Sequence, residues 1–191
     1  MKKLIFALIA GSAAMAAAQA QTTMTPRTYV GAGVASVDHK DNIPGATNVN
    51  SAGYKAGAKL FGGVELNDTF GVEVGHTDFR KSNTTYNLGG VNGNAETRGR
   101  GTYVAGKATM PINEQAAVYG KLGVAHTKNK MTSDLPGVAR THSDNGVYAG
   151  VGVQYALNQQ VSLLAEYERY GKKKDFGPKP DALTIGAKYN F

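Results

Sequence analysis

Three consecutive residues, His142, Ser143 and Asp144, are of the types that make up a hydrolase triad. Such chemistry needs a base within hydrogen-bond reach of the nucleophile and a third group that orients the base. Neighbouring residues in one flexible segment seldom reach that arrangement, which rigid elements hold better. His76 and His126 have no serine nearby in the same register of their own segments. The sequence therefore predicts a protein without a catalytic site.

A second candidate for chemistry is a metal site around His39, which has Asp38 and Asp41 beside it. A single histidine in an acidic segment is usually solvated, and metal sites generally gather several such donors. The chain also has no cysteine, which excludes a disulfide framework. We therefore expect neither a metal nor a cofactor.

Lysines and glutamates form a third group, because they recur at alternate positions inside apolar segments. Glu73, for example, lies between Val72 and Val74. Successive side chains of a strand point to opposite faces, so these charges share one face and the apolar residues the other. Unpaired charge is costly inside an enclosed face, so we expect these charges to pair with one another. Five bases and three acids fall on this face, too uneven for one-to-one pairing: Lys55, Lys59, Lys107, Lys121, Lys188, Glu65, Glu73 and Glu166.

The elements that carry these charges have a period of two, which indicates strands rather than helices. They are about 10 to 13 residues long, close to the length of a tilted strand that crosses a membrane. Eight are predicted: Thr28–Val37, Tyr54–Leu66, Thr69–Phe79, Gly101–Ile112, Gln115–Thr127, Gly146–Leu157, Gln160–Tyr170 and Ala182–Phe191.

The connections between the predicted strands alternate between very short and long. The short ones are polar turns at Asn67-Asp68, Asn113-Glu114 and Asn158-Gln159. The long ones are Asp38–Gly53, Arg80–Arg100, Lys128–Asn145 and Gly171–Asp181. Antiparallel up-and-down strands would place all short turns at one end, as in outer-membrane barrels. A soluble barrel also alternates apolar and polar faces, so this asymmetry, rather than the alternation, favours a membrane barrel.

The N-terminus has the features of an export signal. Met1–Lys3 is positively charged, Leu4–Ala10 is apolar, and Ala18-Gln19-Ala20 fits a cleavage site. We therefore expect residues 1–20 to be a signal peptide and residues 21–191 to form one barrel domain. The formal net charge of +7 would otherwise suggest nucleic acid. Export argues against that partner.

The end of the chain resembles the signal that the outer-membrane barrel assembly machinery reads, with Tyr189 and the final Phe191 as its key residues. The whole of residues 21–191 resembles the transmembrane domain of the outer membrane protein A family and, more distantly, the small opacity and surface-antigen barrels. The segments that carry this resemblance are Thr28–Gly33, Phe61–Asn67, Phe70–Gly75, Ala105–Lys107, Gly152–Leu157 and Ala165–Tyr167.

This resemblance implies an all-β fold, an eight-stranded antiparallel up-and-down transmembrane β-barrel in the bacterial outer membrane. It implies that Glu73 is a lumenal glutamate paired with Lys107 or Lys121. Gln154 and Leu164 stand where the family has a glutamate and an arginine, so the second lumenal pair of that family is missing.

The expected function is that of a noncatalytic barrel that supports envelope integrity and surface contacts. A lumen of eight strands is just wide enough for side chains to fill, so we expect a polar plug. A lipid A-modifying enzyme and a small gated ion pore stay open as alternatives. Expected partners are outer-membrane lipid, the barrel assembly machinery, a host or surface ligand, and lipopolysaccharide phosphates through Lys172, Lys173 and Lys174.

Overall fold

The computed structural model describes residues 26–39, 46–51, 54–134, 139–171 and 178–191, which form strands and their connections. The predicted signal peptide and Lys172–Lys174 lie outside the described residues. The strands are β1 (Arg27–His39), β2 (Ala46–Ser51), β3 (Tyr54–Glu65), β4 (Phe70–Leu88), β5 (Val91–Pro111), β6 (Ala116–Ser133), β7 (Arg140–Ala156), β8 (Val161–Tyr170) and β9 (Pro178–Asn190). None of the described residues forms a helix long and apolar enough to cross a membrane.

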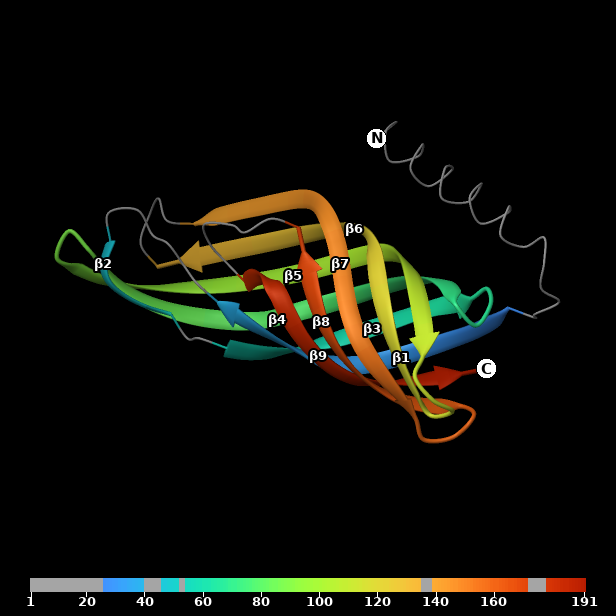
Figure 1. Ribbon diagram of the computed structural model, residues 1–191. Coiled ribbons are helices and arrows are strands. Elements are labelled where there is room, and N and C mark those ends of the chain that lie inside the picture. The colour runs from blue at the N-terminus through green and yellow to red at the C-terminus, as the bar shows by residue number, and fades with distance from the viewer. Residues whose placement is uncertain (1–25, 40–45, 52–53, 135–138, 172–177) are drawn as a thin grey trace, which may run out of the picture.

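Eight of the strands close into a barrel in which every pairing is antiparallel (Figure 1). Strand β1 pairs with β3 on one side and with β9 on the other, so that Gly33 lies opposite both Lys59 and Gly186. Strands β3 to β9 otherwise pair in chain order. The prediction of an eight-stranded antiparallel up-and-down barrel is confirmed.

Strand β2 is additional to the eight predicted strands, and it lies within the expected connection 38–53. It pairs with the far end of β4, where Ala46 is opposite Leu88 and Ser51 is opposite Thr84. Its sequence is rich in Thr and Asn and has no alternation of apolar and polar residues. Hydrophobic periodicity therefore gives no sign of it.

Strands β4 to β7 run well beyond their predicted ends, and Figure 1 shows them extending past the rest of the barrel. The predicted connections 80–100 and 128–145 were wrong, because most of their residues belong to strands. Between β4 and β5 only Gly89 and Gly90 remain as a turn, and both have positive φ, +59° and +87°, which favours glycine. Polar side chains such as Ser82 and Thr84 occupy buried positions there. Both faces of these strand extensions therefore carry polar residues, and the apolar–polar alternation that indicates a strand is missing.

Asp134 fastens the end of β6 to β5. Its carboxylate accepts hydrogen bonds from the Asn94 backbone N–H at 2.8 Å and from the Asn94 amide at 3.3 Å. The Asp134 N–H in turn donates to the Asn94 carbonyl at 3.3 Å. The donated backbone hydrogen bond from Asn94 lowers the pKa of Asp134 below its usual value.

This contact should make local order at the β5–β6 end depend on pH. A carboxylate whose pKa is lowered by folding stabilises the folded form above the ordinary aspartate pKa of about 3.9, and this contribution disappears as pH falls through the lowered value. We expect Asp134→Ala to lower the hydrogen-exchange protection of the Asn94 amide at neutral pH and to abolish its change on acidification. Asp144→Ala, at an exposed residue of β7, is the control. Equal protection in both variants would contradict the role of Asp134.

The short connections at the opposite end share one local structure. The Oδ1 of Asn67 accepts from the N–H of Thr69 at 2.9 Å and of Phe70 at 2.7 Å. Asn113 and Asn158 make the equivalent pairs of hydrogen bonds with the same two distances. An asparagine side chain that bonds to the backbone two residues on stabilises a tight turn. The predicted turns at these three asparagines are present.

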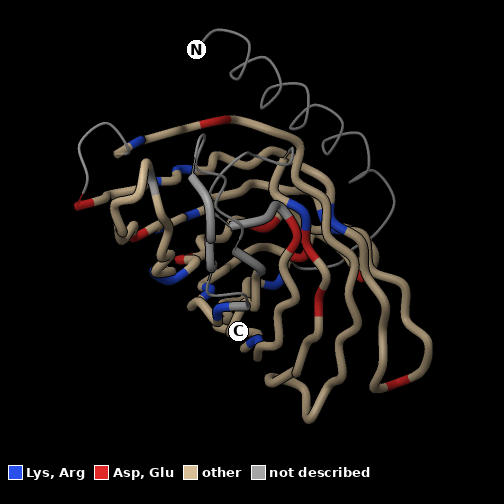
Figure 2. Tube along the Cα trace, turned by 90° about the vertical axis from the view of Figure 1, so that its left-hand side faces the viewer, with Lys and Arg blue, Asp and Glu red and all other residues tan. Residues whose placement is uncertain are grey.

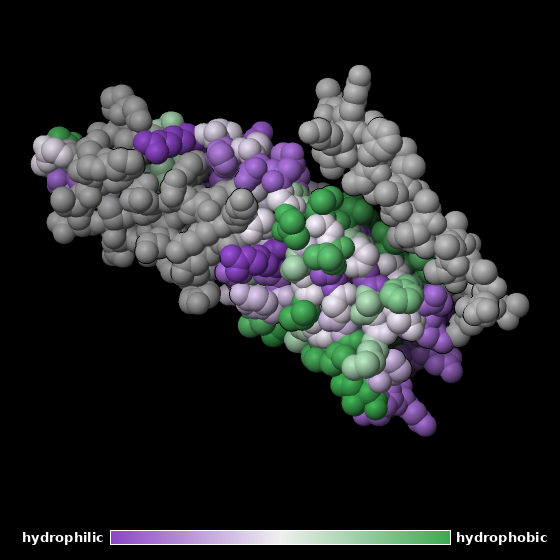
Figure 3. Space-filling view, turned by 45° about the horizontal axis from the view of Figure 1, so that its top comes forward, coloured by the Kyte–Doolittle hydropathy of each residue, from purple (hydrophilic) through white to green (hydrophobic). Residues whose placement is uncertain are grey.

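The two faces of the barrel wall differ as the alternation predicts. Charged residues and tyrosines are buried inside, and Figure 2 shows acidic and basic positions beside one another on neighbouring strands. Gly75 makes room for this filling, because a Cβ there would lie 2.5 Å from the Tyr103 ring. The large aliphatic residues are exposed on the outside, among them Leu122 and Ile185. Hydrophobic surface lies between hydrophilic ends in the face that Figure 3 shows.

Candidate functional site

The barrel lumen holds a network of buried charges, and Glu73 of β4 lies near its middle. Its side chain is almost completely buried. It accepts hydrogen bonds from the Tyr29 hydroxyl at 2.8 Å, from the Lys121 ammonium at 2.6 Å, and from the Tyr103 hydroxyl. These donors come from β1, β6 and β5 respectively. The carboxylate therefore ties together strands that lie on different sides of the lumen.

Lys121 of β6 bridges two carboxylates. Its Nζ lies 2.6 Å from Glu73 Oε1 and 2.6 Å from Glu166 Oε2. Glu166, on β8, also accepts from the hydroxyls of Tyr119 and Tyr148, each at 3.0 Å. Both acids are satisfied by a shared cation and by phenol donors, which is how buried charge is tolerated in low dielectric.

Glu168 forms a second centre nearer the extended strands. It is fully buried and accepts from Lys59 at 2.7 Å. It also accepts from the hydroxyls of Tyr148 at 2.6 Å, Tyr170 at 2.8 Å and Thr184 at 2.5 Å. Glu168 was not among the predicted lumenal charges, although it lies within the predicted strand Gln160–Tyr170. It follows Glu166 by two residues on β8, so both point to the same face.

Glu65 forms a third centre at the end with the short turns. Its carboxylate lies 2.7 Å from Lys188 Nζ, 3.8 Å from Lys107 Nζ and 3.6 Å from Arg27. The Lys107 ammonium also donates to the Gln154 side chain at 3.4 Å. Lys107 therefore interacts with Glu65, and of the two predicted partners of Glu73 it is Lys121 that forms the ion pair within the described lumen.

Tyrosine rings separate the three centres and pack against the lysines. Tyr103 and Tyr148 stack with their ring centroids 4.0 Å apart and an interplanar angle of 6°. The Lys107 ammonium lies 4.7 Å from the centre of the Tyr119 ring, and that of Lys188 lies 4.9 Å from the centre of the Tyr29 ring. Cations at such positions are attracted by the ring face.

With Glu168 included, the described network is balanced at four lysines and four glutamates. The predicted set of charges differs in two ways, because Glu168 belongs to the network and Lys55, on the same face as Lys59, is only half-buried near the extended end. The members are Lys59, Lys107, Lys121, Lys188, Glu65, Glu73, Glu166 and Glu168. The sequence analysis did not assign the tyrosines, although Tyr29, Tyr103, Tyr119, Tyr148 and Tyr170 alternate in register with the lumenal charges.

The triad-like residues do not come together. His142, Ser143 and Asp144 lie in β7, where consecutive side chains point to opposite faces. Ser143 is therefore on the other face of the sheet from His142 and Asp144. Within the described residues, no group of three or more His, Cys, Asp or Glu side chains is arranged to hold a metal ion.

The residues expected to signal assembly are on the outer face of the last strand. Tyr189 and Phe191 are exposed, and their rings make an edge-to-face contact with centroids 5.2 Å apart. The Phe191 N–H donates to the Thr28 carbonyl at 2.9 Å, which holds the chain end against β1.

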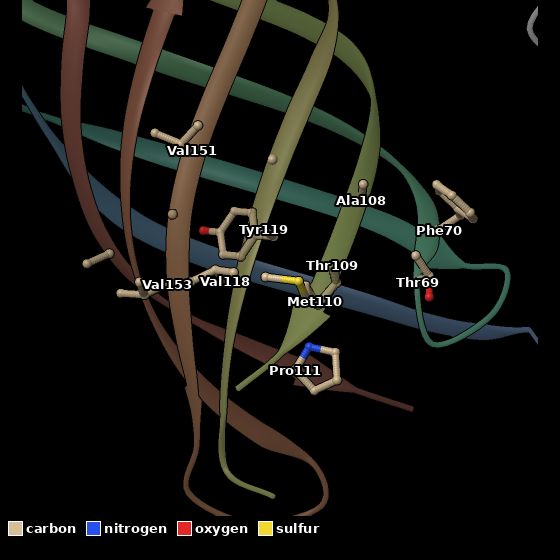
Figure 4. A pocket seen from close by; sticks show the side chains of 13 residues that line it. Thr69, Phe70, Ala108, Thr109, Met110, Pro111, Val118, Tyr119, Val151 and Val153 are labelled. Carbon is tan, nitrogen blue, oxygen red and sulfur yellow. The ribbon is translucent and has the colours of Figure 1, made fainter. Parts of the chain in front are cut away.

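A groove of about 830 Å³ lies on the outer surface toward the short-turn end (Figure 4). Phe70, Met110, Val118 and Val153 line it, together with small residues such as Ala108. Most of its lining comes from the outward-facing side chains of β4 to β8, which belong to the hydrophobic outer surface, here called the apolar belt. Tyr119, which donates to Glu166 in the lumen, also borders it.

A closed antiparallel barrel with an apolar exterior, a charged interior and short turns at one end defines an outer-membrane β-barrel protein. The sequence profile of the outer membrane protein beta-barrel domain family matches residues 4–191, and the chain belongs to that family. Its location is the bacterial outer membrane.

Individual relatives agree with this assignment. Outer membrane protein A of Salmonella typhi is 31% identical over 144 residues, which is 71% of this chain but 40% of the relative. The chain thus spans less than half the length of that relative. Among solved structures, OprG of Pseudomonas aeruginosa has a TM-score of 0.61 with 17% identity, covering 87% of this chain and 96% of that chain. Ail of Yersinia pestis, solved in complex with the heparin analogue sucrose octasulfate, has a TM-score of 0.55 with 20% identity, covering 88% of this chain and 100% of that one. At these identities the two structures show a shared fold.

Proposed function

We propose that this protein is a noncatalytic, non-conducting barrel that supports the integrity of the outer membrane and offers its extended strands for surface contacts. The observation that carries the proposal is that ion pairs cross the lumen between strands that are not neighbours in the sheet. Lys121 joins β4 to β8 through two carboxylates, and Lys59 joins β3 to β8. None of these strand pairs is hydrogen-bonded within the sheet. The ion pairs therefore stabilise the barrel by connecting strands that the sheet hydrogen bonds do not connect.

The same network accounts for a sealed lumen. Eight strands leave an interior that side chains fill, and here those side chains are stacked tyrosines and paired charges. An ion that entered would have to separate Lys121 from two carboxylates, at a cost that low dielectric makes large. A barrel of this kind adds a rigid element to the membrane without adding a leak.

The proposed partners follow from the exterior. The apolar belt requires outer-membrane lipid, and Tyr189 and Phe191 on the exposed face of the last strand suit recognition by the barrel assembly machinery. Residues 1–20 would direct export and residues 21–191 would form the barrel domain. Contacts with lipopolysaccharide through Lys172, Lys173 and Lys174 remain part of the proposal. A surface ligand of the extended strands is also proposed, and the anionic ligand in the Ail structure supports such a role.

Electrical recording in planar bilayers tests the sealed lumen. We expect the purified wild-type protein to give no stable large openings. Glu73→Ala combined with Lys121→Ala removes one ion pair and the side-chain volume that fills the middle of the lumen. This double variant should give brief openings. Val104→Ala combined with Leu122→Ala removes side-chain volume from the lipid-facing surface and should leave the bilayer silent. Stable wild-type openings would instead establish a pore.

Lipid A chemistry tests the noncatalytic part of the proposal. Mass spectrometry of lipid A from cells with and without the protein should give the same acylation pattern. A changed pattern would establish the lipid A-modifying alternative. It would direct attention to Ser143 and His142, although they lie on opposite faces of β7.

A further inference from the structure

Four cations gather on the outer face of β5 and β6, just beyond the apolar belt. Arg98 and Arg100 come from β5, and Lys128 and Lys130 from β6. In the sheet register Arg98 lies directly opposite Lys130, and Arg100 directly opposite Lys128. All four side chains are exposed. We call these four residues the basic patch.

The register of the basic patch is electrostatically unfavourable. Directly opposite residues have Cβ atoms only about 5 Å apart, and like charges there destabilise a sheet. Asp78 of β4 lies directly opposite Arg100 in the register and forms an ion pair of 2.8 Å with Arg98. Arg100, Lys128 and Lys130 have no ion pair with any residue that the structure describes. The patch therefore has four positive charges against the one negative charge of Asp78.

The patch continues the lipid-facing rows of the barrel wall. The last fully apolar row is Val74, Val104, Val124 and Val147, all exposed. The next row outward is polar: His76, Thr102, His126 and Asn145. In it His76 contacts Thr102 and His126 contacts Asn145, both at 2.8 Å. The row after that contains Arg100 and Lys128, which are therefore at the height where lipid headgroups begin.

We propose that the basic patch binds the phosphate groups of a phosphorylated glycolipid of the outer leaflet, of the lipid A type. Guanidinium groups bind phosphate oxygens in a bidentate manner, and ammonium groups supply compact charge. Ser143, opposite Lys128, adds a hydroxyl to the same surface. Two like-charged pairs side by side suit a ligand with more than one phosphate, which would relieve the repulsion inside each pair.

The position of the patch favours a lipid over a soluble polyanion. Its side chains point sideways from the wall, in line with the valine row below them, and not into the lumen or along the barrel axis. A ligand whose acyl chains lie on Val104 and Val124 places its phosphates beside Arg100 and Lys128. This inference rests on the outer-membrane location and is independent of whether the lumen conducts.

Native mass spectrometry of the full chain in detergent, with added diphosphoryl lipid A, tests the proposal. We expect Arg100→Gln combined with Lys128→Gln to weaken retention of diphosphoryl lipid A by at least about tenfold, because each cation near a lipid surface contributes about 1 kcal/mol. Wild-type protein should prefer diphosphoryl lipid A to its dephosphorylated form by a similar factor. Heat-modifiable migration on gels verifies that each variant has folded.

Arg140→Gln combined with Arg169→Gln is the matched control. It removes the same charge, from exposed positions of β7 and β8 that lie off the patch, and should retain lipid A normally. Equal loss in both double variants would overturn the proposal, because it would show a general charge effect. It would also be overturned if dephosphorylated lipid A bound equally well. A third outcome would also overturn it: the patch variant binds a soluble sulfated oligosaccharide more weakly than the wild type does but retains lipid A normally.

Discussion

Lys121→Met is expected to lower the free energy of unfolding by about 3–5 kcal/mol, the usual cost of removing one partner from a buried charge pair. Lys121 Nζ lies 2.6 Å from both Glu73 and Glu166, and all three side chains are almost completely shielded from solvent. Methionine fills nearly the same space but leaves two carboxylates close together without their shared cation. Repulsion between them adds to the loss. Urea titration of the protein in micelles or lipid bilayers measures the difference.

Two further variants separate the lost charge from altered packing. Glu73→Gln introduced into Lys121→Met removes one of the two stranded charges and should recover part of the stability. Lys55→Met is the matched control, since Lys55 is half-buried and outside the network, and it should change stability by less than about 1 kcal/mol. A loss of equal size in Lys55→Met would show that Lys121 acts as an ordinary lysine.

Glu168→Ala is expected to have an effect of similar size, about 3–5 kcal/mol, for the opposite reason. Four donors converge on this carboxylate, and its removal leaves Lys59 with only Glu166, 3.5 Å away. The hydroxyls of Tyr148 and Tyr170 also lose an acceptor that is shielded from water. The same urea titration, with unfolding followed by circular dichroism, measures the loss.

Replacing the pair together tests whether charge is the cause. Glu168→Leu combined with Lys59→Met removes both ions and keeps most of the volume, so it should be far less destabilising than Glu168→Ala alone. Glu168→Gln keeps acceptors for the phenols and should fall between the two. If the double variant were the least stable of the three, the ion pair could not explain the importance of Glu168.

Strand number, strand order and the direction of each face were predictable from the sequence because the membrane makes one face apolar. Val74 and Val104 mark the exterior, and Glu73 between its valines marks the interior. Where the strands extend beyond the membrane, the difference in polarity between the outer and inner faces ends. Ser82, Thr84 and Thr97 are buried but polar, so β2 and the extensions of β4 to β7 resembled loops.

Most members of the network were predictable from the sequence, but their pairing was not. Alternation placed Glu73, Lys107 and Lys121 on one face, yet it could not show which lysine reaches which acid. Lys107 and Lys121 are directly opposite each other in the sheet, and the choice depends on how long side chains cross the lumen. Glu168 was missed although it lies in the predicted strand Gln160–Tyr170, where its spacing of two residues from Glu166 would have placed it on the inner face.

The pairing of β1 with β9 has a consequence for biosynthesis. Strand β1 finds its second partner only in β9, where Gly186, 153 residues after Gly33, lies opposite it. Until β9 has been synthesised, β1 has one unoccupied edge, and such edges readily pair with other chains. We therefore expect a chain that lacks β9 to leave the edges of β1 and β8 open to pairing with other copies.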